Sequence, residues 1–270
     1  MNAVFGILRA SLRLLILPVI TVSMVMTLSL GLLLRVPFPG LGWPLFRWAI
    51  NTWGRGVLLT MGVRVTISGQ APKPPFFLVA NHLSYLDIPL LHSQMHGHFL
   101  SKAEIASWPI AGLFAKLAGT LFVDRSLRGD LKRVIPEVET LLRTGNGVMI
   151  FPEGTSSMGA EILPFKASLF EVARRAQVAV STAALKYSMR GSDLAVGAVV
   201  CWWGNMPFAS HFLRLLTVPG VDAQVTFGSQ VPIDDDRKRL SSRAQEAVFE
   251  HFHPSTPAEH VAELRRVFSP

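Results

Sequence analysis

The chain has 270 residues, enough for one large domain or a domain with an appendage, and its mean hydropathy of +0.37 is high for a soluble protein, so we expect membrane association. The formal net charge of +8 indicates an anionic partner, and the lack of a recognisable nucleic-acid module favours lipid head groups over nucleic acid. The single cysteine, Cys201, excludes an intramolecular disulfide and fits a reducing compartment.

The first predicted element is an apolar helix from Leu14 to Leu34, a stretch without any charged residue. Arg9 and Arg13 precede it and Arg35 follows it. At about 1.5 Å per residue it is long enough to cross a hydrocarbon core of about 30 Å. It is too long for a cleaved signal peptide, and a buried core helix rarely runs so far. We therefore expect a membrane anchor, spanning or re-entrant, with a slight preference for a cytoplasmic carboxyl side.

The segment 39–61 predicts a second helix, at the membrane interface. Aromatic rings suit the head-group boundary, where guanidinium groups can meet phosphates. The alternative is a core helix whose tryptophans simply pack. The residues concerned are Trp43, Phe46, Arg47, Trp48, Trp53 and Arg55.

After Gly62 the pattern becomes that of an α/β domain, so an anchor of residues 1–61 is expected to precede a domain of residues 62–270. Strands are predicted at 63–67, 76–80, 98–102, 121–123, 148–151, 178–184, 194–201 and 223–227. Helices are predicted at 87–95, 109–118, 131–143, 166–176, 236–253 and 257–267.

A polar cluster, 81–87, follows the apolar strand at 76–80 and so falls at the strand's carboxyl end, where α/β sheets place their chemistry. His82 is suited to act as a general base, and Asp87 to orient it and support its imidazolium form. No nucleophile accompanies them, so the attacking group would come from a substrate. The alternative is that Asn81 or Ser84 caps a helix and His82 is an ordinary loop histidine.

Two later strand ends also carry candidate residues. Arg125 ends the block at 119–125, and its guanidinium suits bidentate capture of a phosphate, although it could instead be a surface arginine paired with a nearby aspartate. The block Phe-Pro-Glu-Gly-Thr at 151–155 offers Glu153 and a glycine that lets the backbone approach a ligand. Its alternative is an ordinary turn with an exposed glutamate.

Together these three blocks resemble the membrane-associated glycerolipid acyltransferases, the 1-acyl-sn-glycerol-3-phosphate acyltransferase family. The resemblance rests on His-x-x-x-x-Asp at 82–87, Gly-x-x-Phe-x-x-Arg at 119–125 and Phe-Pro-Glu-Gly-Thr at 151–155, and it covers roughly residues 60–190. It implies an α/β fold, a central mixed sheet flanked by helices on a membrane surface. It also implies transfer of a fatty acyl group to the free hydroxyl of a lysolipid, with 1-acyl-sn-glycerol-3-phosphate as the first expected acceptor and phosphatidic acid as the product.

The same resemblance assigns roles to residues. It implies that His82 is the catalytic base and Asp87 its orienting partner. Further residues would bind the acceptor or shape its site: Arg125, Lys102, Glu153, Gly154 and Thr155.

The resemblance also implies partners, and the charge pattern implies a location. The acyl donor would be acyl-CoA or acyl-acyl-carrier protein, used as a co-substrate, with no bound cofactor and no metal. The lysolipid acceptor would be the other substrate. Independently of the resemblance, the net charge predicts an anionic membrane surface as partner, and the flanking arginines favour a catalytic domain on the cytoplasmic side of the inner membrane.

One departure from the family pattern leaves the acceptor open. The third block often continues with arginine, but Ser156 stands there, followed by Ser157. Glu-Gly-Thr-Ser-Ser sequences also occur among relatives that acylate other lysolipids, including lyso-ornithine lipid. A lyso-ornithine lipid or another lysolipid is therefore the alternative acceptor.

Three competing interpretations of the sequence remain open. An acyl hydrolase would use His82 and Asp87 to activate water, although no Gly-x-Ser-x-Gly elbow is present. A metal site could be built from His92, His96 and His98, but no acidic or cysteine ligand is close in sequence. A non-catalytic lipid-binding module would not need His82.

Overall fold

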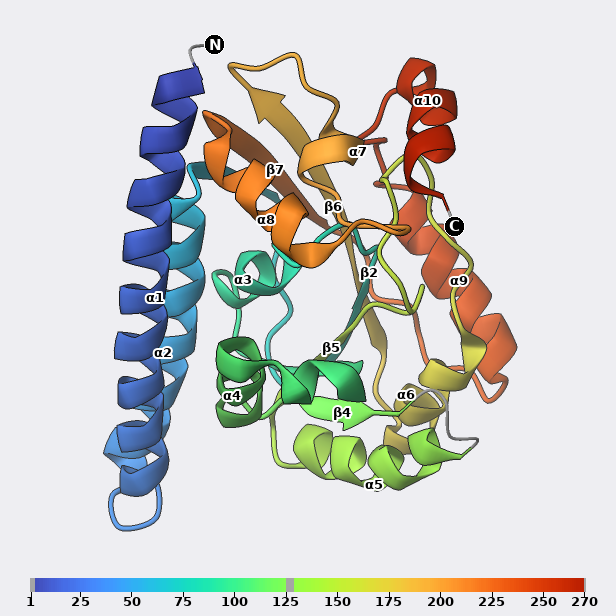
Figure 1. The fold of residues 1–270 in the computed structure, drawn as a ribbon. Helices are drawn as coiled ribbons and strands as arrows, with labels where there is room; N and C mark the ends of the chain where they lie inside the picture. The colour runs from blue at the N-terminus through green and yellow to red at the C-terminus, as the bar shows by residue number, and fades with distance from the viewer. Residues whose placement is uncertain (1–2, 125–128, 270) are drawn as a thin grey trace.

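The computed structural model describes residues 3–124 and 129–269. A mixed seven-stranded sheet forms its centre, in the order β1-β7-β6-β2-β5-β3-β4. Neighbouring strands are parallel except for β6 and β7, which pair antiparallel. The predicted α/β fold with a central mixed sheet flanked by helices is confirmed (Figure 1).

The elements have the following bounds. The strands are β1 (Val63–Ser68), β2 (Phe76–Ala80), β3 (His98–Lys102), β4 (Leu121–Val123), β5 (Gly147–Ile150), β6 (Val180–Arg190) and β7 (Gly220–Phe227). The first helices are α1 (Ala3–Leu34), α2 (Pro39–Thr60), α3 (Asp87–His92), η1 (Ala103–Ser107), α4 (Pro109–Leu117) and α5 (Asp130–Arg143). The remaining helices are η2 (Ala167–Phe170), α6 (Glu171–Ala176), α7 (Val196–Val199), α8 (Phe208–Thr217), α9 (Arg237–Phe249) and α10 (Ala258–Phe268).

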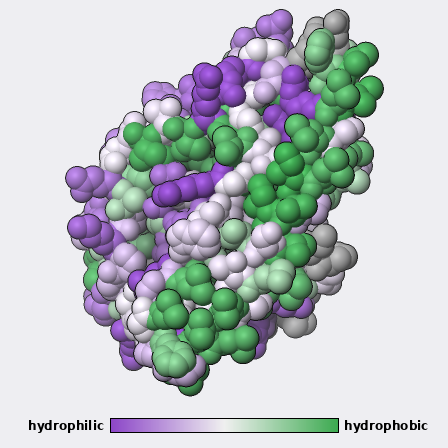
Figure 2. All heavy atoms as spheres, turned by 90° about the vertical axis from the view of Figure 1, so that its left-hand side faces the viewer, coloured by the Kyte–Doolittle hydropathy of each residue, from purple (hydrophilic) through white to green (hydrophobic). Residues whose placement is uncertain are grey.

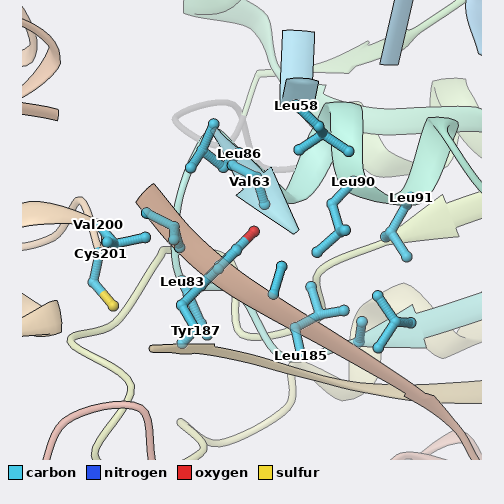
Figure 3. Packing of buried hydrophobic residues seen from close by; sticks show 14 of the residues in the cluster. Leu58, Val63, Leu83, Leu86, Leu90, Leu91, Leu185, Tyr187, Val200 and Cys201 are labelled. Atoms are coloured by element: carbon cyan, nitrogen blue, oxygen red, sulfur yellow. The ribbon is translucent and has the colours of Figure 1, made fainter. Parts of the chain in front are cut away.

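The central strands are apolar along their whole length because helices cover both faces of the sheet. Every residue of β2 and β5 is buried. One core cluster joins the sheet to α3, α7, α8 and α10, and a second joins its other face to α5, α6 and α9. Figure 3 shows part of the first cluster, with Tyr187 and Cys201 among its leucines. Burial on both faces is what a continuous apolar run in a parallel sheet predicts.

Parallel pairing brings several chain segments to one edge of the sheet. Since β2, β5, β3 and β4 are parallel, their carboxyl ends lie at the same edge. The residues following β2 and β5 begin at Asn81 and Phe151, and β3 ends at Lys102. The first and third sequence blocks therefore meet at this edge, as the strand positions predict.

The two N-terminal helices form an antiparallel hairpin along one side of the domain (Figure 1). Small residues set their close approach near the tip. A Cβ atom on Gly31 would lie 3.0 Å from the backbone nitrogen of Phe46, and one on Gly42 would lie 2.5 Å from the Cα of Arg35. Larger side chains would push the helices apart at this point.

The hairpin leaves much of its apolar surface uncovered. Helix α1 is long and apolar enough to cross a membrane, and only 11% of its most apolar 18-residue stretch is buried. Its exposed side chains include Leu15, Val19 and Met26, and Phe38 and Leu41 are exposed at the turn. Figure 2, which views the hairpin side, shows hydrophobic surface running along this face and at its lower end.

Arg9 and Arg13 hold the first turns of α1 to the domain. Arg13 is 5% exposed and donates to the carbonyl oxygens of Thr60, Leu216 and Val218 at 2.8–2.9 Å. Arg9 donates to the carbonyl of Thr217 at 2.6 Å. The sequence places these arginines as flanks of a membrane segment, whereas in the structure they bind carbonyls at the carboxyl ends of α2 and α8. A positive charge is favoured at the carboxyl end of a helix, which explains why the two arginines bind there.

The second helix combines both expectations for its tryptophans. Trp48 is 55% exposed, as an interfacial residue would be. Trp53 stacks on Phe114 of α4 with ring centroids 4.0 Å apart, as a packed core residue would be. Helix α2 therefore has one face on the domain and another facing outward.

In the carboxyl-terminal half one prediction is wrong and one helix was not predicted. The segment 194–201 is not a strand but contains the short helix α7, buried against Leu264 of α10. A short apolar run fits a buried helix as well as a strand, so periodicity could not separate them. Helix α8 was not predicted at all, and it supplies His211 and Phe208 to the neighbourhood of the sheet edge.

Candidate active site

His82 and Asp87 form a close pair at the carboxyl edge of the sheet. Nδ1 of His82 lies 2.7 Å from Oδ2 of Asp87. The aspartate is fully buried, whereas the His82 side chain keeps 22% of its surface exposed. Because Nδ1 faces the carboxylate, Nε2 is the ring nitrogen left to exchange a proton with a substrate. The structure thus brings together the two residues that the spacing predicted.

The loop between β2 and α3 folds around the Asp87 carboxylate. Oδ2 also accepts hydrogen bonds from the backbone amides of Leu83 at 2.7 Å and Ser84 at 3.0 Å. Asp87 is the first residue of α3, where a negative charge is favoured. The Ser84 hydroxyl accepts from the Leu86 amide at 3.3 Å, so Ser84 does cap the start of this helix, but the contact with Asp87 shows that His82 is not the ordinary loop histidine of the alternative.

Asn81 has a different task, which is to continue the sheet. Its side-chain amide donates to the carbonyl of Leu185 at 3.0 Å and its side-chain oxygen accepts from the Leu185 amide at 2.7 Å. The Asn81 side chain therefore makes the two hydrogen bonds to β6 that the backbone of β2 would make if that strand continued. His82 is therefore held between Asn81, which binds β6, and Asp87, which binds its ring.

Glu153 of the third block anchors the backbone of His82. Its carboxylate accepts from the amide of His82 at 2.8 Å and from the amide of Leu163 at 3.1 Å. Burial raises the pKa of Glu153 to about 8, with the nearby charge of Asp87 adding to the rise and the two amides opposing it. The alternative of an exposed turn glutamate is excluded, since Glu153 is 3% exposed.

The remainder of the third block packs on His82. The ring of Phe151 stacks on the imidazole with centroids 4.1 Å apart, and the amide of Ser157 donates to the His82 carbonyl at 2.9 Å. Gly154 has a φ of +77°, and its amide donates to the carbonyl of Phe151 at 3.0 Å. The Gly154 amide thus closes the turn.

Ser156 stands where the family often has arginine, and it joins the site to the segment after α7. Its hydroxyl donates to the carbonyl of Trp202. The amide of Trp202 in turn donates to the carbonyl of Leu83 at 2.9 Å. Trp202 therefore ties the first block to the third, a contact that no sequence pattern indicated.

The other expected binding residues make no direct contact with the His82–Asp87 pair among the described contacts. Lys102 ends β3 at the same sheet edge and is exposed, and Thr155 is exposed beside Gly154. In the second block, Gly119 has a φ of +75°, and its carbonyl lies 3.0 Å from Nδ1 of His98. Arg125 lies outside the described residues.

Three side chains near the pair were missed by sequence reasoning. The Tyr187 hydroxyl donates to Oδ1 of Asp87 at 2.7 Å. The Tyr85 hydroxyl lies 3.0 Å from Nδ1 of His211, whose Nε2 lies 3.0 Å from the Cys201 carbonyl. No sequence motif singles out His211, and the apolar, aromatic residues around it in the sequence were the one available signal.

Candidate nucleophiles close to the pair are not poised for attack. Cys201 is fully buried, and burial raises the pKa of its thiol well above the ordinary value. The Ser156 hydroxyl is bound to a carbonyl. Within residues 3–124 and 129–269, no three or more His, Cys, Asp and Glu residues are grouped so that they could hold a metal ion. The arrangement suits proton transfer to and from a substrate group.

Comparison with known proteins gives the family. The family model named Acyltransferase matches residues 62–186. A lyso-ornithine lipid O-acyltransferase of Pseudomonas aeruginosa is 35% identical over 217 residues, 80% of this chain and 83% of that protein. A 1-acyl-sn-glycerol-3-phosphate acyltransferase of Neisseria meningitidis is 32% identical over 209 residues, 74% of this chain and 79% of that protein.

A solved structure shares the fold. The 1-acyl-sn-glycerophosphate acyltransferase PlsC of Thermotoga maritima is 20% identical, with a TM-score of 0.67, and the match covers 93% of this chain and 98% of that one. The sequence relatives and this fold agree with the family indicated by the three blocks. The chain therefore belongs to the acyltransferase family that includes the 1-acyl-sn-glycerol-3-phosphate acyltransferases and the lyso-ornithine lipid O-acyltransferases.

Proposed function

We propose that this protein transfers a fatty acyl group from a thioester to the free hydroxyl of a lysolipid, with His82 as the catalytic base and Asp87 as its orienting partner. The observation that carries the proposal is the 2.7 Å contact between Nδ1 of His82 and the buried Asp87 carboxylate. It fixes the tautomer of the imidazole and supports its protonated form.

The reaction proceeds in two proton transfers. Nε2 of His82 takes the proton of the lysolipid hydroxyl as the oxygen attacks the thioester carbonyl carbon, which forms the ester C–O bond. The C–S bond then breaks, and the leaving thiolate takes the proton back from the imidazolium. Direct transfer is supported over an acyl-enzyme because Cys201 is buried and the Ser156 hydroxyl is bound to Trp202.

The donor is acyl-CoA or acyl-acyl-carrier protein, since both present a thioester to the same base. Glu153 and Gly154 shape the acceptor site through the loop that carries Phe151. Lys102, Thr155 and Arg125 are proposed to bind the acceptor head group. Lys102 and Thr155 are exposed and therefore accessible to a ligand.

We propose two candidate acceptors, 1-acyl-sn-glycerol-3-phosphate and lyso-ornithine lipid. The observation favouring lyso-ornithine lipid is Ser156, a neutral side chain held by Trp202 where an arginine would offer a phosphate ligand. The relative from Pseudomonas aeruginosa, named for that acceptor, supports the same choice. The relative from Neisseria meningitidis supports the phosphate acceptor.

The hairpin of α1 and α2 is proposed to hold the enzyme on the cytoplasmic side of the inner membrane, where the lysolipid resides. Its exposed apolar face and the net charge of +8 support binding to an anionic bilayer. Residues 1–61 would thus act as the anchor and 62–270 as the acyltransferase domain.

An acceptor panel tests the proposal. Protein reconstituted in anionic vesicles receives one labelled acyl-CoA, or the same acyl group on carrier protein, with lysophosphatidic acid, lyso-ornithine lipid or another lysolipid. We expect label in the diacyl product of one acceptor, and none with His82→Ala. Release of free fatty acid at the same rate without any lysolipid would instead support an acyl hydrolase.

A further inference from the structure

Asp87 receives more hydrogen bonds than a pair with His82 requires. Its Oδ2 atom accepts from the imidazole and from two backbone amides, all supplied by the loop 82–84. The other oxygen, Oδ1, accepts from the hydroxyl of Tyr187 at 2.7 Å. Both partners of this second contact are 0% exposed, so water does not replace it.

Tyr187 is held at this place by contacts on both sides of β6. Its backbone pairs with Ala223 of β7, and its amide donates to the hydroxyl of Ser255 at 2.9 Å. The amide of Ser255 also donates to the carbonyl of Gly159, which follows the third block, at 2.7 Å. The carboxyl-terminal segment therefore fixes the strand that delivers the phenol to Asp87.

We propose that Tyr187 is a positioning residue for the transferase reaction, which holds the Asp87 carboxylate in its ionised form and in line with His82. The inference rests on the proposed function for its kinetic consequences, but its physical basis is the contact itself. Tyr187 lies one residue beyond the segment that the family model matches, 62–186. The phenol is a dependable donor because burial raises its pKa well above the ordinary value.

The contact should change the proton affinity of the pair. The phenol hydrogen bond offsets part of the negative charge of the Asp87 carboxylate, so less of that charge is left to stabilise a proton on the His82 imidazole. Without that bond the pair binds a proton more tightly, and its apparent pKa rises. Catalysis needs His82 unprotonated, so the acid limb of the pH profile moves to higher pH.

Other ionisable groups near Asp87 could also change the pH dependence, so the test variant must leave them in place. Glu153 lies on the loop after β5 and Cys201 on the segment after α7, and both feel the charge of Asp87. Tyr187→Phe leaves both in place. It removes one oxygen atom and keeps the ring that fills the core.

The chain offers a matched control, since Tyr85 and Tyr187 are its two tyrosines. Tyr85 is partly buried, and its hydroxyl contacts His211 rather than Asp87. Tyr85→Phe thus deletes a hydroxyl and a hydrogen bond close to the site without touching the carboxylate.

The experiment measures kcat and KM against pH for the wild type, Tyr187→Phe and Tyr85→Phe, in the vesicle assay with the best acceptor. We expect the acid limb of kcat/KM to move up by about one pH unit in Tyr187→Phe, with KM for the lysolipid unchanged at the plateau. Tyr85→Phe should leave the limb where it is. An unmoved limb in Tyr187→Phe, or the same shift in both variants, would overturn the inference.

A second measurement separates this inference from the proposed function. Titration of the His82 imidazole by NMR, assigned with His82→Asn, needs no substrate. The pKa of His82 should rise in Tyr187→Phe even if no lysolipid of the panel is acylated. A wild type without transferase activity would refute the proposed function, whereas an unchanged His82 titration would refute the role of Tyr187.

Discussion

His82 and His96 lie fourteen positions apart in the sequence and have opposite surroundings. The His82 ring has a carboxylate partner and an exposed edge. Both ring nitrogens of His96 are buried without a hydrogen-bond partner among the described residues, and the ring packs edge-on against Phe46 and His98. The same side chain is equipped for proton transfer at one site and only fills space at the other.

The pKa values follow from this difference. Burial lowers the pKa of His96 to about 3, with further lowering by the neighbouring charges of His98 and Arg47. Burial likewise lowers the pKa of His92 to about 3. A histidine without an anionic partner stays neutral in the folded protein, whereas the Asp87 carboxylate would stabilise a protonated His82 in the proposed reaction. A buried carboxylate beside the ring therefore separates a candidate base from a packing residue.

The largest effect is expected from removing either member of the pair. His82→Ala or Asp87→Asn should lower kcat by about 10²–10⁴-fold, because the lysolipid hydroxyl loses its base or the imidazolium loses its counter-charge. Initial rates with labelled acyl thioester measure this, and vesicle sedimentation should show unchanged membrane binding. Full activity of purified His82→Ala would contradict the mechanism.

A smaller effect, on stability, is expected at Glu153. Its pKa is raised to about 8 in the folded protein, against about 4.5 in the unfolded chain, so the folded state keeps a proton that the unfolded state has lost. The free energy of unfolding should therefore decrease as the pH rises from about 4.5 to about 8. Glu153→Gln should flatten this dependence in denaturation experiments between pH 5 and 8.

Glu153→Ala serves as the control at that position. It removes the acceptor of both the His82 and Leu163 amides, so it should lower Tm more than Glu153→Gln does. Equal pH slopes in the wild type and Glu153→Gln would show that Glu153 titrates normally.

The smallest effect on activity is expected at His96. His96→Leu removes two buried nitrogens that have no partners, so stability near neutral pH should be unchanged or slightly higher, and activity should be retained. In the wild type the lowered pKa means that stability is lost as the pH falls from about 6.5 toward 3, because only the unfolded chain takes up the proton. The variant should resist acid better in thermal melts from pH 7 to pH 4. Loss of activity in His96→Leu would break the comparison with His82.

The sequence predicted the centre of the site because its parts are local or follow from parallel strands. His82 and Asp87 share one loop, and Glu153 reaches His82 because β2 and β5 are adjacent and parallel. Chemistry at strand ends is a general property of such sheets, so these residues could be found without coordinates.

The supporting contacts could not be predicted in this way. Tyr187 is 100 residues from Asp87, and Ser255 is 68 residues from Tyr187, so no spacing relates them. Helix α7 was mistaken for a strand because its apolar run is too short for periodicity to decide. The carbonyl partners of Arg13 at Leu216 and Val218 are 203 and 205 residues away in sequence, so these contacts could not be predicted either.

The arginine contacts and the glycine contacts of the hairpin together fix the register of α1. Arg13 holds the helix to backbone carbonyls at one end, and Gly31 packs on the backbone of Phe46 near the other. One inserted residue between them would rotate one end by about 100° relative to the other and break one of the two attachments. Helix α1 is thus a spacer of fixed length. The number of residues from Arg13 to Gly31 sets how far the hairpin tip lies from the end of the helix that is attached to the domain.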